Sequence, residues 1–313
     1  MGVGKSARGN HLSGMDTETA FAAYEAVRHR LPSPATGRKA ATRSETLDDI
    51  ADSYDAFFLD AFGVLNIGET AIPGVVERVA SLKARGKRVI VVSNAAGFPH
   101  ATLMEKYHRL GYGFAPEDVI TSRAALLAAP QPAGPMKWGL MATPSAGLQD
   151  FEGLDVTYLD DDPAIYTQVD GFLMIGSAVW TEHRQALLTA ALRDRPRPVW
   201  VGNPDIVAPR ETGFSIEPGH FAHRLANGTG VTPRFFGKPF LDIYDLAFQR
   251  LAPEIKRARV LMVGDSLHTD ILGAQNAGVA SALIAGYGFF AGQNVESAIA
   301  KSGIKPDHIL ERP

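Results

Sequence analysis

Four short stretches of this 313-residue chain place polar residues directly after an apolar run or directly before a helical pattern. The stretches read FFLDAFGVL, VVSNAAG, FFGKP and VLMVGDSLHTDI. Their polar residues, in chain order, are Asp60, Ser93 with Asn94, Lys238, and Asp265 with Asp270. A carboxylate can act as a nucleophile, hydroxyl and amide groups bind anions, an ammonium neutralises negative charge, and two carboxylates hold a hard cation. Together the four stretches predict phosphoryl transfer.

Each stretch also has an ordinary structural explanation when it is taken alone. Asp60 fits a turn, and Ser93 with Asn94 fits the start of a helix. Lys238 fits a solvated loop, and the acid pair of the fourth stretch fits helix capping. The functional interpretation therefore depends on the combination and on its order along the chain.

The residues around the first two stretches alternate between strand and helix patterns. Apolar runs at 56–59 and 89–92 predict strands, and a helical stripe at 75–82, opened by Pro73 and closed by Gly86, predicts the helix between them. Because the strands are continuously apolar, both of their faces should be buried, as in a parallel sheet covered by helices. We predict an α/β fold with a Rossmann-like, doubly wound parallel sheet as its core. Ligands of such sheets collect at the carboxyl ends of the strands, where the polar residues stand.

A proline-containing break, AAPQPAGP, interrupts this rhythm after about residue 128. The following segment has strand patterns of its own, and the first rhythm resumes near Phe235. We therefore predict a core domain over 46–128 and 226–313, with an inserted smaller α/β cap domain over 129–225.

Residues 1–45 are expected to form an N-terminal extension with a peripheral helix. Phe21, Tyr24 and Val27 recur at helical spacing behind Asp16, a suitable cap. The stretch 32–44 reads as a linker, and the pattern that follows it predicts a short helix over about 47–54. The opening MGVGKS resembles part of a phosphate-binding loop, but too few residues precede it for the buried strand that such a loop needs.

Composition excludes several classes of function. The formal charge of −3 and the sequence pI near 6.3 provide no basic field for a nucleic acid polymer. The absence of cysteine excludes thiolate metal sites and a Cys nucleophile, so any metal must bind oxygen or imidazole. No apolar run approaches the roughly 20 residues that span a bilayer, and residues 1–15 lack the apolar core of a secretory signal. We expect a cytoplasmic protein with no membrane partner.

The four stretches resemble the motifs of the haloacid dehalogenase-like (HAD) hydrolase superfamily, across roughly residues 50–310. The insertion between the second and third motifs, together with GNPD at 202–205, is similar to subfamily IIA, the capped phosphatases of nucleotides, sugars, glycerol and pyridoxal. The resemblance implies that Asp60 attacks phosphorus and forms an aspartyl-phosphate. It also implies that Ser93 and Asn94 bind the phosphoryl oxygens, and that Lys238 neutralises their charge and orients Asp60.

The same resemblance implies a metal and a substrate class. Mg²⁺ would be held by Asp60, Asp265 and the carbonyl of Phe62, with Asp270 supporting the site from behind. The partner would be a small phosphorylated metabolite enclosed by the cap, towards which Asn203 and Asp205 are expected to point. A homodimer is common among such proteins.

One position departs from the superfamily pattern. Its phosphatases carry a second Asp two residues after the nucleophile, which protonates the leaving oxygen and later activates water, and here that residue is Phe62. A phosphonatase-like or phosphotransfer activity, or a catalytically weak phosphometabolite-binding protein, therefore stands as an alternative to a phosphatase. Asn66, which cannot ionise, and His268, which can, are the nearby candidates for a substitute.

Three further groups of residues have both a structural and a functional interpretation. His220 and His223 could face one way on a helix as metal ligands, although no third ligand is evident. The acidic run 160–162 before Pro163 fits a solvated turn, with calcium binding as the other option. Phe289 and Phe290 could line the mouth of a pocket or simply pack.

Overall fold

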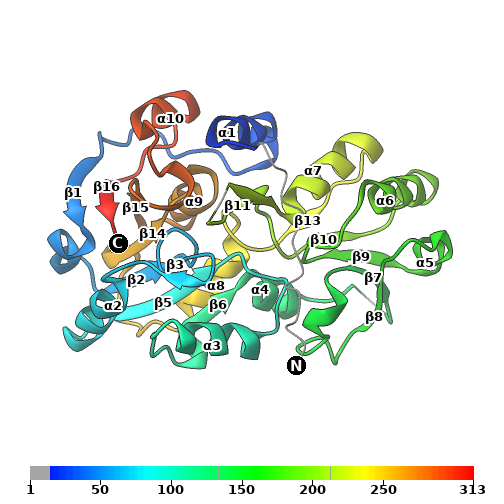
Figure 1. The fold of residues 1–313 in the computed structure, drawn as a ribbon, viewed down its shortest axis with the longest axis horizontal. Helices are drawn as coiled ribbons and strands as arrows, with labels where there is room; N and C mark the ends of the chain where they lie inside the picture. Colours follow the sequence, from blue (N-terminus) through cyan, green and yellow to red (C-terminus); the bar gives the residue numbers. More distant parts are fainter. Residues whose placement is uncertain (1–14, 133, 212) are drawn as a thin grey trace, which may run out of the picture.

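A computed structural model describes residues 15–132, 134–211 and 213–313, so the MGVGKS stretch lies outside the described residues. Its larger sheet has seven parallel strands in the order β1-β16-β15-β14-β2-β5-β6, on the left in Figure 1. The strands are β1 (Thr42–Thr46), β2 (Ala56–Leu59), β5 (Arg88–Ser93), β6 (Val119–Thr121), β14 (Val260–Gly264), β15 (Ala280–Ile284) and β16 (His308–Arg312). From β2 the chain first adds β5 and β6 on one side, and later adds β14, β15 and β16 on the other side. This arrangement confirms the predicted Rossmann-like α/β fold.

Helices cover both faces of this sheet. Alternate residues of β2 face opposite ways: Phe58 packs in one apolar cluster with α8, and Phe57 packs in another with α2 and α3. The central strands are thereby shielded from water on both faces, which explains why residues 56–59, 89–92 and 260–263 are all apolar. The helices that belong to this half of the molecule are α2 (Val75–Ala84), α3 (His100–Arg109), α4 (Ser122–Ala128), α8 (Leu241–Phe248), α9 (Leu272–Ala277) and α10 (Val295–Ser302).

A second sheet lies beside the first, on the right in Figure 1. It has five parallel strands in the order β13-β10-β9-β7-β8. Its elements are β7 (Lys137–Met141), β8 (Asp155–Tyr158), α5 (Pro163–Gln168), β9 (Gly171–Met174), α6 (Glu182–Asp194), β10 (Val199–Val201), α7 (Pro218–Thr229) and β13 (Arg234–Phe235). Because β13 completes it, this sheet extends ten residues past the predicted boundary at 225.

Two short hairpins complete the strands. One is β3 (Asn66–Ile67) with β4 (Thr70–Ala71), directly after the Asp60 stretch. The other is β11 (Val207–Pro209) with β12 (Phe214–Ile216), which leaves the second sheet and returns to it. Both hairpins lie near the carboxyl end of β2, so they contribute to the site described below.

The linker predicted over 32–44 and the helix predicted over 47–54 are wrong in part. Residues 42–46 form the edge strand β1, which pairs with β16 in a register that sets Thr42 against His308. Two short 3-10 helices, Leu47–Asp49 and Ala51–Ser53, then lead into β2. The sequence TRSET of β1 is polar because an edge strand is largely exposed, so it lacks the apolar signal that identified the central strands.

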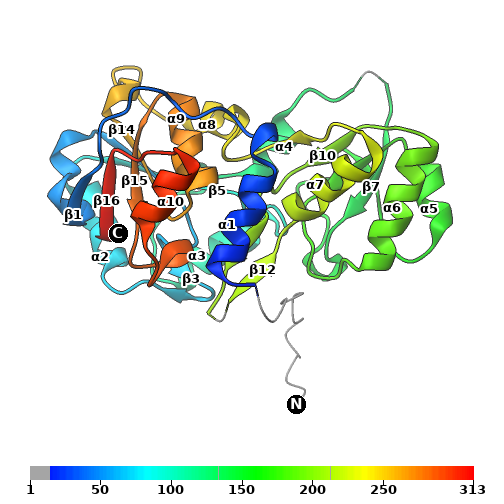
Figure 2. The ribbon, with the colours of Figure 1, turned by 90° about the horizontal axis from the view of Figure 1, so that it is seen from above.

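Helix α1 (Thr17–Ala26) begins where predicted, since the Asp16 carboxylate accepts a hydrogen bond from the Thr19 N–H. It is less peripheral than predicted, however. Figure 2 shows α1 between the two halves of the molecule, beside α10 and near α7. Its Ala20 and Tyr24 are buried in a cluster with β11, β12 and the segment that follows β14.

Three contacts show how α1 joins the two halves of the molecule. The Ile206 N–H donates to the Tyr24 hydroxyl over 3.1 Å, and the Tyr24 ring stacks on His268, with 5.0 Å between the ring centroids. Glu25 accepts a hydrogen bond from the His268 imidazole over 2.5 Å. The extension therefore ties the segment after β10 to the segment after β14.

None of the helices in the described part of the chain is long and apolar enough to cross a membrane.

Substitutions at Tyr24 test this tie. Tyr24→Phe leaves the buried Ile206 N–H without a partner and should lower the free energy of unfolding by about 1–3 kcal/mol. Tyr24→Ala also removes a buried ring, and we expect a loss of about 3–5 kcal/mol. Urea unfolding measures both. Tyr158→Phe is the matched control, because the buried Tyr158 hydroxyl has no hydrogen-bond partner among the described residues and its loss should cost little. Equal effects of the two Tyr→Phe changes would contradict the tie.

Candidate active site

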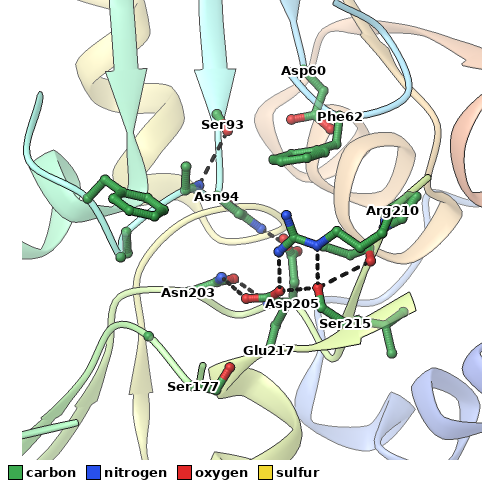
Figure 3. Close-up of a pocket in the computed structure, with 18 of the residues that line it drawn as sticks. Asp60, Phe62, Ser93, Asn94, Ser177, Asn203, Asp205, Arg210, Ser215 and Glu217 are labelled. Carbon is green, nitrogen blue, oxygen red and sulfur yellow. Dashed lines mark hydrogen bonds and ion pairs between the residues drawn. The ribbon is translucent and has the colours of Figure 1, made fainter. Parts of the chain in front are cut away.

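The carboxyl ends of β2, β5 and β14 open into a cavity of about 390 Å³ between the two sheets (Figure 3). Six of the site residues predicted in the core domain line it: Asp60, Phe62, Ser93, Asn94, Lys238 and Asp265. Asn203 and Asp205 line it from the side of the second sheet. Asp270 is fully buried behind them. The structure thus brings residues from five separate stretches of the chain to one place.

The Lys238 side chain lies at the centre of this group. Its ammonium donates to the Asp60 carboxylate over 2.5 Å and to the Asp270 carboxylate over 2.7 Å, and only 2% of the side chain is exposed. Burial lowers the pKa of Lys238, but the Asp270 and Asp60 carboxylates outweigh that effect, so the pKa lies above its usual value. The lysine is therefore a permanent cation that holds two acids in place.

The acids outnumber this cation. Asp60, Asp265 and Asp270 each place a carboxylate oxygen within 4.8 Å of the other two. Burial raises the pKa of Asp60 to about 6, and Asp270 adds to the rise while Lys238 opposes it. Burial also raises the pKa of Asp265 well above its usual value, again helped by Asp270 and Asp60. Three buried oxygen ligands with one lysine between them have a donor set and a charge that suit a hard divalent cation.

The remaining hydrogen bonds distinguish the roles of the acids. Asp270 uses both oxygens within the protein, because one accepts from Lys238 and the other from the Ser266 N–H over 3.0 Å. Asp265 uses one oxygen, which accepts from the Phe289 N–H over 2.7 Å. The second oxygen of Asp265 is therefore available to a metal, whereas both oxygens of Asp270 are occupied.

Two glycines make room for Asp265. A Cβ atom on Gly63 or on Gly288 would overlap the Asp265 carboxylate, and both glycines have a left-handed backbone, with φ of 77° and 70°. Any larger residue at either position would displace the carboxylate.

The backbone at Phe62 suits its expected role as a carbonyl ligand. Phe62 pairs with Asn66 through an isolated bridge, in which the Asn66 N–H donates to the Ala61 carbonyl and the Gly63 N–H donates to the Asn66 carbonyl. Neither bond uses the carbonyl of Phe62 itself. That oxygen stays available beside Asp60.

The Asn94 side chain has a different position from the one expected. Its amide donates to the Lys238 carbonyl over 2.9 Å and to the Asp205 carboxylate over 2.7 Å, and its oxygen accepts from the Lys238 N–H over 2.7 Å. Both amide hydrogens are therefore engaged by the protein, and the side chain cannot also bind a phosphoryl oxygen. Asn94 instead joins the end of β5 to the Lys238 loop and to Asp205.

The Phe62 ring has two cationic neighbours that the sequence analysis missed. The Lys106 ammonium lies 4.8 Å from the ring centroid and the Arg210 guanidinium carbon lies 5.1 Å from it, both within cation–π range. Lys106 comes from α3 and Arg210 from the turn after β11. Both residues line the cavity.

A polar network extends from Arg210 across the floor of the cavity, as the dashed lines in Figure 3 show. The guanidinium donates to the Ser215 hydroxyl over 2.8 Å and to the Glu217 carboxylate over 3.1 Å. The Asn203 amide donates to the same carboxylate over 3.1 Å, and the Asp205 N–H donates to the Asn203 oxygen over 3.0 Å. The GNPD stretch is thereby joined to the β11–β12 hairpin.

The two candidates for a substitute acid lie away from the cavity. His268 is 1% exposed, stacks on Tyr24 and does not line the cavity. Asn66 is fully buried, and its amide donates to the Gly68 carbonyl over 2.8 Å. Neither side chain reaches the place where a leaving group would stand.

The remaining sequence candidates have structural positions. His223 is buried on α7 and stacks on Phe235, and burial lowers its pKa to about 4. Among the described residues, the only group of three or more potential metal-ligating side chains is the acidic group of the cavity, so His220 and His223 do not join one. Asp162 caps α5, as the turn interpretation predicts. Phe289 lines the cavity, and Phe290 packs in the neighbouring apolar cluster.

Comparison with known proteins identifies the family. One family model, described as haloacid dehalogenase-like hydrolase, matches residues 57–136, and a second, described as HAD-hydrolase-like, matches residues 235–312. The two matches contain Asp60 and Ser93, and Lys238 and Asp265, respectively. The chain belongs to the haloacid dehalogenase-like hydrolases. As a HAD hydrolase it is an enzyme, and the fold that the resemblance implied is confirmed.

Individual HAD relatives are similar over most of their length. The human glycerol-3-phosphate phosphatase is 28% identical, over 88% of this chain and 92% of its own. A solved structure described as a possible sugar phosphatase of the HAD superfamily, from Cytophaga hutchinsonii, has a TM-score of 0.74 and 26% identity, over 87% of this chain and 98% of its own. The glycerol phosphate phosphatase of Mycobacterium tuberculosis, solved in complex with magnesium, has a TM-score of 0.64 and 25% identity, over 83% of this chain and 75% of its own.

The half-buried Asp205 carboxyl makes stability depend on pH. Burial raises its pKa to about 8, although Lys238 and the Asn94 amide oppose the rise. The native state therefore binds a proton that the unfolded state releases, and this stabilisation is lost as the pH rises from about 4 to about 8. Asp205→Asn mimics the protonated form and removes the dependence. We expect the stability of the variant, relative to the unmodified chain, to increase by up to about 1.4 kcal/mol per pH unit across this range in urea unfolding. A difference that is constant with pH would contradict the shifted pKa.

Proposed function

We propose that this HAD hydrolase removes phosphate from a small phosphorylated metabolite through an aspartyl-phosphate on Asp60. The observation that supports this most directly is the buried group of Lys238, Asp60 and Asp270 at the carboxyl ends of β2 and β14, open to a cavity of metabolite size. The relatives named above are phosphatases by name, which is consistent with the proposal.

The reaction has two steps, each a substitution at phosphorus. In the first, an oxygen of Asp60 attacks the phosphorus atom, the bond from phosphorus to the ester oxygen breaks, and the leaving oxygen takes a proton from solvent water, because Phe62 has none to donate. In the second, water attacks the phosphorus, the bond to Asp60 breaks, and inorganic phosphate leaves with the carboxylate restored. Lys238 orients Asp60 and offsets the negative charge of the phosphoryl oxygens, which the Ser93 hydroxyl also contacts.

Asp60, Asp265 and the Phe62 carbonyl would hold Mg²⁺, with Asp270 fixing Lys238 behind them. The ion would supply positive charge that offsets repulsion between the nucleophile and the phosphoryl group. The segment 137–235 would act as the cap that closes over the metabolite, because it supplies Ser177, Asn203 and Asp205 to the cavity lining.

Phe62 keeps a second candidate function open. No ionisable side chain at position 62 protonates the leaving oxygen, so a phosphonatase-like or phosphotransfer activity, or weak turnover with tight binding, is the alternative. The two groups of functions differ in whether simple phosphate esters are hydrolysed.

Removal of the nucleophile tests the main proposal. Asp60→Asn should reduce hydrolysis of p-nitrophenyl phosphate to background, because an amide does not attack phosphorus. EDTA should have the same effect on the unmodified chain, and added Mg²⁺ should reverse it. Asp52→Asn is the control, since the Asp52 side chain is 94% exposed and, among the described residues, pairs with Arg85 alone. Retained activity in folded Asp60→Asn protein would assign the nucleophile elsewhere.

Substitution of Phe62 tests the missing acid. General acid–base catalysis contributes about 10²- to 10⁴-fold, but Lys106 and Arg210 would hold an introduced carboxylate in its ionised form. We therefore expect Phe62→Asp to raise kcat/KM for ethyl phosphate by much less than this, and the double variant Phe62→Asp/Arg210→Gln to raise it further. Phe62→Asn is the control, because Asn has the size of Asp but cannot act as an acid. A full gain in the single variant would show that the two cations do not control position 62.

A further inference from the structure

Two positive charges are held close together at the place where the leaving group of a HAD substrate would stand. Phe62 follows Asp60 by two residues, and its ring lies 4.8 Å from the Lys106 ammonium and 5.1 Å from the Arg210 guanidinium carbon. Burial lowers the pKa of Lys106, Glu69 opposes the fall, and repulsion from Arg210 adds to it, so the two cations act on each other. An anionic group placed beside the ring would be attracted by both cations.

Carboxylates that also line the cavity hold both cations in position. The Lys106 ammonium donates to the Glu69 carboxylate and to the Gly68 carbonyl, each over 2.9 Å. The Arg210 guanidinium is held by Ser215 and Glu217, as described above. These contacts fix the direction in which each cation presents its remaining hydrogens.

Both cations retain donors for a ligand. An ammonium has three N–H groups and a guanidinium has five, and each of these residues uses two of them on partners among the described residues. Because both side chains line the cavity, the free donors are available to its contents. A guanidinium with two free N–H groups can bind a carboxylate or a phosphate in bidentate fashion.

We propose that Lys106 and Arg210 bind an anionic substituent on the leaving group, so that the substrate is a phosphate monoester with a carboxylate or a second phosphate near the ester oxygen. This inference rests on the proposed function for the identity of the reacting group. It deepens that function by naming the substrate class. It also explains why an aromatic residue occupies position 62, since the ring supports the two cations, whereas an Asp there would neutralise them.

The test measures binding separately from turnover. The Asp60→Asn chain, in the presence of Mg²⁺, is titrated with four ligands in a calorimeter: ethyl phosphate, phosphoglycolate, glycol bisphosphate and phosphoethanolamine. We expect phosphoglycolate or glycol bisphosphate to bind about tenfold or more tightly than ethyl phosphate, and phosphoethanolamine to bind more weakly than ethyl phosphate. If phosphoglycolate binds more tightly than glycol bisphosphate, the recognised group is a carboxylate; if glycol bisphosphate binds more tightly, it is a phosphate.

Variants then assign the preference to the two cations. Arg210→Gln and Lys106→Met, each added to the Asp60→Asn chain, should bring the ratio of affinities for the anionic ligand and ethyl phosphate close to one, and Arg210→Lys and Lys106→Arg should restore part of it. Lys83→Met is the matched control for Lys106, because the Lys83 ammonium also donates to a backbone carbonyl over 2.9 Å and lies 4.7 Å from a ring, that of Phe114, away from the cavity. Arg234→Gln is the control for Arg210, since Arg234 lies 4.6 Å from the Phe236 ring outside the cavity.

Equal binding of ethyl phosphate and the ligands with a second anionic group would overturn the inference. A preference that persists in both Arg210→Gln and Lys106→Met would overturn it too. The conservative Arg and Lys exchanges keep the test decisive if either charge-removing variant fails to fold. Failure of the proposed function has a different signature, because the unmodified chain would then hydrolyse no phosphate ester while the binding ratios still decide the inference.

Discussion

The buried Lys238 ammonium is the interaction on which the site depends. It lies between Asp60 and Asp270, which are 210 residues apart in the chain, and its ammonium donates to both carboxylates. Losing one partner of such a group costs about 3–5 kcal/mol, because the remaining charge is left buried and unpaired. The strand ends are therefore held in register by charge as well as by packing.

The surrounding contacts carry this constraint to the second sheet. Asn94 bonds to both the N–H and the carbonyl of Lys238, and its remaining amide hydrogen goes to Asp205. From Asp205 the network continues through Asn203 and Glu217 to Arg210. A displacement of the second sheet would therefore act on the lysine loop through directional hydrogen bonds. The carboxyl ends of the core strands and the cavity wall formed by residues 203–217 are therefore joined by one continuous hydrogen-bond network.

Sequence patterns predicted the parts of this site that depend on single elements. Continuous apolar runs located β2, β5 and β14, and the residue that ends each run is by position at the ligand-binding edge of the sheet. They did not predict Tyr24, Lys106 or Arg210, because each of these lies on an ordinary helix or turn and gains its role only through the approach of a distant element. The role expected of the Asn94 side chain failed for a related reason: a polar side chain beside a ligand site can equally bond to the protein, and the sequence does not distinguish the two.

The pairing of β1 with β16 has a consequence for the order in which the molecule folds. Strand β1 finds its partner in β16, at residues 308–312, and Tyr24 finds its partners at residues 206 and 268. On the ribosome the first 46 residues emerge long before these partners exist, whereas the sheet of residues 137–235 has all its strands soon after it is synthesised. Contacts of such large sequence separation slow folding, so the second sheet can fold ahead of the core that flanks it in sequence. The nascent chain must keep an unpaired strand and an amphipathic helix in solution until residues 308–312 are synthesised, and the polar sequence of that strand keeps it soluble in the meantime.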